Sequence, residues 1–98
     1  MYISNWTFRP AAGKQAEVIE NSKKVAEYWD KYCASECHLF VLHGAYGGCM
    51  SFIAMFENAE AFGKANDGVV ADPDFQELLA KVSSTGDFVR HNLVRRVF

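Results

Sequence analysis

Residues 36–57 read ECHLFVLHGAYGGCMSFIAMFE and contain two strongly apolar runs. The first run is ECHLFVLHG at 36–44, and the second is CMSFIAMFE at 49–57. The segment between them, AYGG at 45–48, contains two glycines. A glycine-containing loop between two apolar runs is typical of a β-hairpin. The stretch therefore predicts two neighbouring antiparallel strands.

Both predicted strands are apolar on both faces. In the first, Leu39 and Val41 point one way while Phe40 and Leu42 point the other way. An antiparallel sheet with one face in water alternates apolar and polar residues instead. We therefore expect each face of this sheet to be covered. Helices can cover one face, and a second sheet, most simply from another subunit, can cover the other.

The segments before the hairpin predict a strand and a helix. MYISNWTFR at 1–9 alternates, with Tyr2, Ser4, Trp6 and Phe8 on one face. From Lys14 to about Cys33 the apolar spacing changes to three and four residues, which is typical of a long amphipathic helix. Its buried stripe is expected to comprise Val18, Ser22, Val25, Trp29 and Tyr32, widened by Ile19, Ala26 and Cys33.

The segments after the hairpin predict two helices and a last strand. Asn58 caps a short helix at 58–68 that stops at Gly68, and Asp72 with Pro73 opens a second helix at 72–82. A strand follows at 87–98. The order is that of the ferredoxin-like α+β fold, βαββαβ, with an antiparallel four-stranded sheet in the order 4-1-3-2. We expect residues 1–98 to form a single domain.

Composition excludes several classes of protein. The net charge is −2 and the basic residues are scattered, so we expect no nucleic-acid partner. No apolar run reaches membrane-spanning length, and the N-terminus lacks the pattern of a signal peptide. Three cysteines without an export signal are typical of a reducing compartment, which predicts a cytoplasmic location.

The stretch 32–49 raises the alternative of a metal or redox site. It holds all three cysteines and two of the three histidines, namely Cys33, Cys37, Cys49, His38 and His43. His38 and His43 are five residues apart, so on one strand they point to opposite faces. Cys37 and His43 share a face but lie about 20 Å apart by strand rise. The Cys-x-x-Cys spacing and a glycine-rich phosphate loop are missing, so we expect no metal and no bound cofactor.

Two sets of residues are candidates for a functional site. Asn5, His38 and His43 are candidates for orienting a substrate or moving a proton, since histidine titrates near neutral pH. A cleft between sheet and helix is expected to be lined by aromatic residues, namely Trp6, Trp29, Tyr32 and Tyr46. The alternative for the aromatic residues is plain core packing, and for the histidines an edge or interface position.

Three stretches carry a resemblance to a known superfamily. They are TFRPAAGK at 7–14, FIAMFENAEAF at 52–62 and DPDFQELLAKV at 72–82. The chain resembles the dimeric α+β barrel superfamily, which includes antibiotic-biosynthesis-monooxygenase-like and NIPSNAP-like proteins. The resemblance implies a homodimeric barrel formed by sheet-to-sheet packing, with ligands between sheet and helices. The Asn, Trp and His positions of haem-degrading members fall near Trp6, Ala65 and Leu79, so haem degradation is not expected.

The function that follows is the binding or conversion of a hydrophobic or aromatic small molecule in a sheet–helix cleft. As an enzyme, the protein would be a cofactor-independent monooxygenase or an isomerase-like enzyme. As a binding module, it would hold a ligand or a partner protein without catalysing a reaction. Convergence of Asn5, a histidine of the 36–44 strand and Trp29 in one cavity would favour the enzyme or ligand alternatives. A solidly packed interior would favour a structural dimer.

Overall fold

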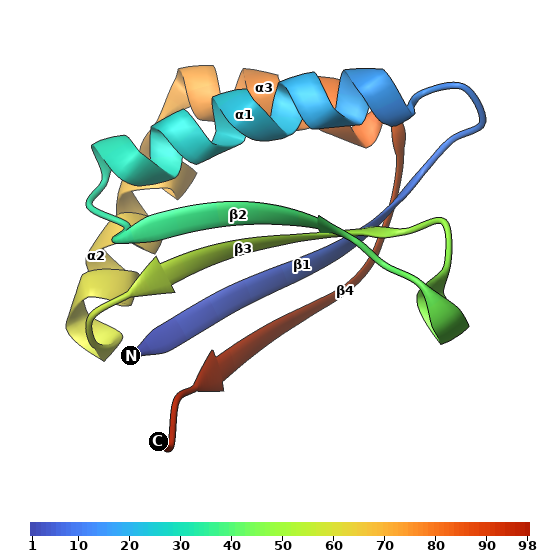
Figure 1. Ribbon diagram of the computed structural model, residues 1–98. Coiled ribbons are helices and arrows are strands. Elements are labelled where there is room, and N and C mark those ends of the chain that lie inside the picture. The colour runs from blue at the N-terminus through green and yellow to red at the C-terminus, as the bar shows by residue number, and fades with distance from the viewer.

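The computed structural model describes residues 1–98. It contains four strands, three α-helices and one short 3-10 helix, with both termini at the same end of the sheet (Figure 1). In chain order the elements are β1 Tyr2–Pro10, α1 Gln15–Lys31, β2 Glu36–Val41, η1 Gly44–Tyr46, β3 Met50–Phe56, α2 Ala59–Ala71, α3 Pro73–Ser83 and β4 Gly86–Arg95.

The four strands form one antiparallel sheet in the order β2-β3-β1-β4. The helices lie on one side of this sheet, which leaves the other side uncovered in the single chain (Figure 1). Both the βαββαβ order and the predicted strand order are therefore confirmed. None of the helices combines the length and the apolar character needed to cross a bilayer.

The hairpin differs from its predicted register. We expected His43 to lie opposite Met50, but Val41 pairs with Met50 and strand β2 ends there. The connection is longer than AYGG because Gly44 and Gly48 adopt positive φ angles around η1, which turns the chain before strand β3. The ladder is shifted by two residues, so each strand residue keeps its predicted face, whereas His43 lies in the loop.

Two element ends also differ from prediction. Helix α2 continues past Gly68 to Ala71. A Cβ atom at Gly68 would overlap the ring of Tyr32, so this glycine makes room for α1 rather than ending α2. The helix ends where Asp72 takes an extended conformation, because the residue before a proline disfavours the helical region. Strand β4 ends at Arg95 rather than at the C-terminus.

The main core lies between the helices and the strand face they cover. Phe56 of β3 is completely buried and makes an edge contact with Trp29 of α1, with ring centroids 5.7 Å apart. Trp29 also contacts Phe75 of α3. A second, smaller cluster joins Phe8, Val18 and Met50 near the other end of the sheet. These contacts hold α1 and α3 over the strands.

We call the side of the sheet away from the helices the open face. Its cross-strand rows follow from the register, for example Asn92, Asn5, Ile53 and His38 across the four strands. The β2–β3 loop bends toward this side (Figure 1), and Tyr46 in the loop contacts the guanidinium of Arg90, 5.4 Å from the ring centroid.

Candidate functional site

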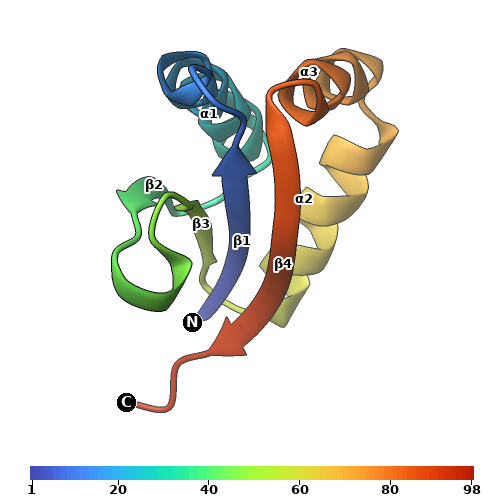
Figure 2. The ribbon, with the colours of Figure 1, turned by 90° about the vertical axis from the view of Figure 1, so that its right-hand side faces the viewer.

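A half-open cavity of about 460 Å³ lies between the sheet and the helices; we call it the cleft. Helices α1 and α3 run side by side above β1 and β4, as Figure 2 shows from the end of the sheet. Fifteen of the 21 residues that line the cleft are hydrophobic, and they come from all four strands and all three α-helices. The interior is therefore not packed solid, and the space falls within the range of about 300–1,000 Å³ that is usual for ligand sites.

Trp6 is the centre of an aromatic cluster that forms part of the cleft wall. Its ring centroid lies 5.3 Å from that of Trp29 and 6.0 Å from that of Phe52. On its other side, the ring of His91 stacks on it at 4.7 Å with an interplanar angle of 11°. Strand register explains this contact, since Trp6 of β1 lies directly opposite both Phe52 and His91.

The cleft has few polar groups and no acidic ones. Its polar and charged lining residues are Ser22, Asn66, Gln76, Ser83, Arg90 and His91. Within this set, His91 is anchored by a 2.7 Å hydrogen bond between Nε2 and the Oγ atom of Ser4. Partial burial lowers the pKa of His91 below its usual 6.5, so the imidazole is neutral at pH 7.

Sequence reasoning missed His91 as a cleft residue. His91 was not among the candidate residues, and it lies on β4, an edge strand of the sheet. An edge strand still presents alternate residues to the covered side, however. The alternation of side chains along a strand could have revealed it. If β4 pairs with β1, every second residue of β4 must lie on the same face of the sheet as Trp6.

The predicted aromatic lining is found in part. Trp6 and Trp29 line the cleft, as expected. Tyr32 does not, since its ring packs over Gly68 and its hydroxyl bonds to Asp72. Tyr46 lies in the β2–β3 loop with Arg90 and does not line the cleft.

The three predicted catalytic residues do not line the cleft. Asn5 and His38 occupy one cross-strand row of the open face, with Ile53 between them. The Asn5 Oδ1 accepts a hydrogen bond of 2.8 Å from Ser51, and His38 Nε2 lies 3.2 Å from a carboxylate oxygen of Glu36. His43 lies in the loop before η1. Asn5 and His38 therefore do not converge with Trp29, because the odd-numbered residues of β1 and the even-numbered residues of β2 face away from the helices.

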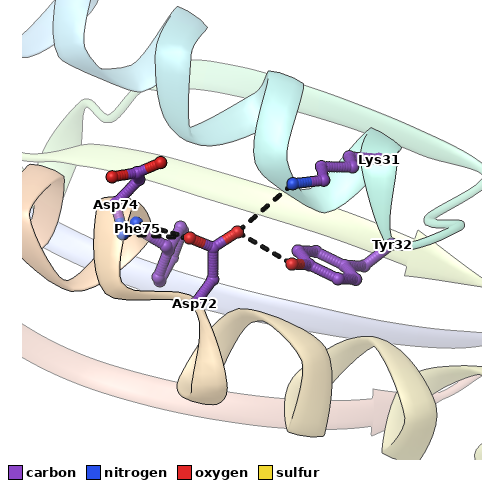
Figure 3. Close-up of polar contacts among 5 residues, drawn as sticks. All are labelled: Lys31, Tyr32, Asp72, Asp74 and Phe75. Carbon is purple, nitrogen blue, oxygen red and sulfur yellow. Dashed lines mark hydrogen bonds and ion pairs between the residues drawn. The ribbon is translucent and has the colours of Figure 1, made fainter.

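Asp72, between α2 and α3, links these two helices to the C-terminal end of α1 (Figure 3). One carboxylate oxygen accepts hydrogen bonds from the backbone N–H groups of Asp74 and Phe75, which caps α3. The other accepts a 2.8 Å bond from the Tyr32 hydroxyl and lies 3.5 Å from the ammonium of Lys31. We call these five residues the Asp72 cluster. Asp74 is exposed in the first turn of α3.

The cysteines are dispersed. Cys49 is completely buried, Cys37 faces the helices at the edge of the main core, and Cys33 is exposed with a positive φ angle of 72°. All three are free thiols. The structure brings no three histidine, cysteine or acidic side chains into a metal-binding group.

Neither a known family model nor a curated protein sequence matches this chain. Solved structures do match it. A NIPSNAP domain protein from Burkholderia xenovorans has a TM-score of 0.79 at 14% identity, covering 99% of this chain and 95% of the other. A variant of SnoaB, a cofactor-independent oxygenase from Streptomyces nogalater, has a TM-score of 0.78 at 15% identity, covering 99% and 93%. An antibiotic biosynthesis monooxygenase has a TM-score of 0.66 at 15% identity, covering 96% and 94%.

The chain has the fold of NIPSNAP and monooxygenase-like proteins. The resemblance predicted from TFRPAAGK, FIAMFENAEAF and DPDFQELLAKV is therefore confirmed at the level of the fold. At these identities the likeness concerns the fold alone, because one fold serves many unrelated activities. The activity has to be argued from the cleft.

Proposed function

We propose that this protein binds a flat hydrophobic or aromatic small molecule in the cleft, without a resident cofactor. The observation that carries the proposal is the cleft itself, a space of about 460 Å³ walled mainly by apolar side chains. The half-buried ring of Trp6 offers apolar surface at the cleft wall against which a flat molecule can pack, and the buried ring of Trp29 supports it from 5.3 Å away. Burial of apolar ligand surface against such a wall supplies the binding free energy.

The enzymatic form of this proposal adds that the protein chemically converts the bound ligand. SnoaB, which shares the fold, is a cofactor-independent oxygenase. This analogy supports a cofactor-free monooxygenase or isomerase-like reaction, and the alternative is a module that binds its ligand or a partner without chemistry. Both forms place the small molecule in the cleft, so binding is the step to test first.

We further propose that two copies pair through their open faces. Exposed apolar side chains support this pairing, in particular Phe40 and Val94, which are 50% and 46% exposed on that side of the sheet. A cytoplasmic location and a single folding unit over residues 1–98 complete the proposal. Three free cysteines support a reducing compartment.

Binding can be tested with 1-aminoanthracene, a flat probe whose fluorescence rises in apolar surroundings. The only two tryptophans of the chain both line the cleft, so their emission should fall as the probe fluorescence rises. Val25→Phe fills the cleft from α1 and should weaken binding at least about tenfold. Ile19→Phe, on the same helix outside the cleft lining, is the matched control and should bind as the wild type does.

The two variants also separate cleft binding from adsorption elsewhere. Thermal melts of both variants should first show that each remains folded. The proposed function is wrong if 1-aminoanthracene shows no saturable binding, or if it binds equally well to the wild type and to folded Val25→Phe.

A further inference from the structure

The hydrogen bond between Ser4 and His91 restricts the protonation of the imidazole. The Ser4 side chain is completely buried, and the Nε2 atom of His91 is its one side-chain hydrogen-bond partner, at 2.7 Å. A serine hydroxyl carries a proton that must be donated to an acceptor. A buried hydroxyl whose proton has no acceptor loses hydrogen bonding that it had in water.

The two neutral tautomers of His91 differ in whether they accept the proton of the Ser4 hydroxyl. If Nε2 carries the proton, it donates to the Ser4 Oγ atom and leaves the hydroxyl proton without an acceptor. If Nε2 is bare, it accepts the hydroxyl proton, and Nδ1 then carries the ring proton. The second arrangement satisfies the buried serine, so the bond favours the Nδ1–H tautomer.

The Nδ1–H group is then a fixed donor beside an apolar cleft. His91 lines the cleft as a residue that is only partly buried, and its ring has no second hydrogen-bond partner within the protein. Stacking on Trp6 sets the plane of the ring. No protein group accepts a hydrogen bond from Nδ1 in the structure, and no carboxylate lines the cleft, so the acceptor is left to the bound molecule or to water.

We propose that His91, held in the Nδ1–H tautomer by Ser4, donates a hydrogen bond to a carbonyl oxygen of the apolar molecule in the cleft. The inference rests on the proposed function and narrows its ligands to flat molecules that carry a carbonyl group, such as aromatic ketones. Partial burial, which lowers the pKa of this histidine, keeps the ring neutral at pH 7 with a single N–H group.

Fluorenone and fluorene form a matched pair of probes, because they share a flat tricyclic skeleton and differ by one carbonyl oxygen. Their affinities can be measured at pH 7 by displacement of 1-aminoanthracene. We expect fluorenone to bind roughly fivefold more tightly, which is the usual net effect of one neutral hydrogen bond. Equal affinities would overturn the inference while leaving the proposed function intact. If 1-aminoanthracene binds but neither fluorenone nor fluorene displaces it, the inference is overturned while the proposed function stands.

Two histidine variants test the assignment to this residue. His91→Phe keeps a flat ring for stacking on Trp6 but removes the donor, so fluorenone and fluorene should bind equally well. His38→Phe makes the same change on the open face and should retain the preference for fluorenone. A preference that survives in folded His91→Phe would assign the donor to another group and overturn the inference.

The tautomer has an independent readout in the imidazole ¹⁵N chemical shifts. The wild type should show a protonated Nδ1 and a bare Nε2 at His91 above its pKa. Ser4→Ala removes the hydroxyl and should move His91 toward the Nε2–H form, with a smaller preference for fluorenone. A wild-type His91 in the Nε2–H form would contradict the inference, even where fluorenone binds.

Discussion

His91 and His38 have the same side chain but different surroundings, because they occupy opposite faces of one sheet. His91 shares a face with Trp6, whereas His38 shares a cross-strand row with Ile53 and Asn5. A stack on an indole and a buried serine hydroxyl orient the ring of His91. His38 contacts Glu36 at an exposed position, where an ion pair contributes little.

The three cysteines lead to a prediction about single residues. Burial, with a smaller contribution from Asp30, raises the pKa of Cys37 to about 11. Roughly one thousandth of its thiols are then ionised at pH 8, and the thiolate is the reactive form. We expect iodoacetamide at pH 8 to modify the exposed Cys33 much faster than Cys37, as measured by peptide mass spectrometry over time. Cys33→Ser should remove the fast phase, and equally fast labelling of Cys37 would contradict this account.

At the scale of elements, the Asp72 cluster joins the C-terminal end of α1 to the start of α3. The Tyr32 hydroxyl hydrogen bond is the main cause that lowers the pKa of Asp72 below its usual 3.8, with help from the N–H groups of Phe75 and Asp74 and from Lys31. Because the folded pKa is the lower one, the unfolded state binds more protons in acid. The carboxylate therefore stabilises the fold above about pH 4, and this contribution is lost as the pH falls through the folded pKa.

Asp72→Asn should lower the melting temperature at pH 7, because the amide is uncharged and can accept fewer of these hydrogen bonds. The difference from the wild type should shrink as the pH falls below 3.8, where the wild-type carboxylate also becomes protonated. Asp74→Asn is the control, since this exposed carboxylate lies in the same helical turn without a side-chain partner. Melting curves between pH 2.5 and pH 7, monitored by circular dichroism, would measure both variants. A pH-independent gap for Asp72→Asn would contradict the proposed role of its charge.

At the scale of the whole molecule, the uncovered face of the sheet is the main feature that the single chain leaves unexplained. Leu93 and Val94 allow a direct test, because both are 46% exposed, lie side by side on β4 and point to opposite faces. Val94→Arg places a charge on the open face and should raise the dimer dissociation constant at least about tenfold. Sedimentation velocity over a range of concentrations would measure the shift.

Leu93→Arg adds the same charge on the side of the helices and should leave the dimer unchanged. A wild-type protein that sediments as a monomer at micromolar concentration would contradict open-face pairing. Equal weakening by both substitutions would show that the apolar open face is not the interface.

The amino-acid sequence by itself determined the order of the elements and which residues of a strand share a face, but not which of the two faces the helices cover. Apolar periodicity specifies both, since a strand repeats every two residues and a helix every 3.6. The run LFVL, apolar on both sides, predicted that helices cover one face of the sheet, which the structure shows, and that a second sheet covers the other face, which stays a prediction. Trp6 and Trp29, the aromatic residues proposed for a sheet–helix cleft, both line the cavity of the structure.

Only the tertiary structure decided which histidine lies at the cleft. Ser4 and His91 are 87 residues apart in the chain, and their contact depends on the pairing and register of β1 and β4. The β2–β3 loop likewise moved His43 off its predicted strand, because glycines with positive φ angles lengthened the turn. Local patterns specify the face on which a side chain lies, but strand pairing brings distant side chains together, and that pairing is set by the packing of the whole sheet.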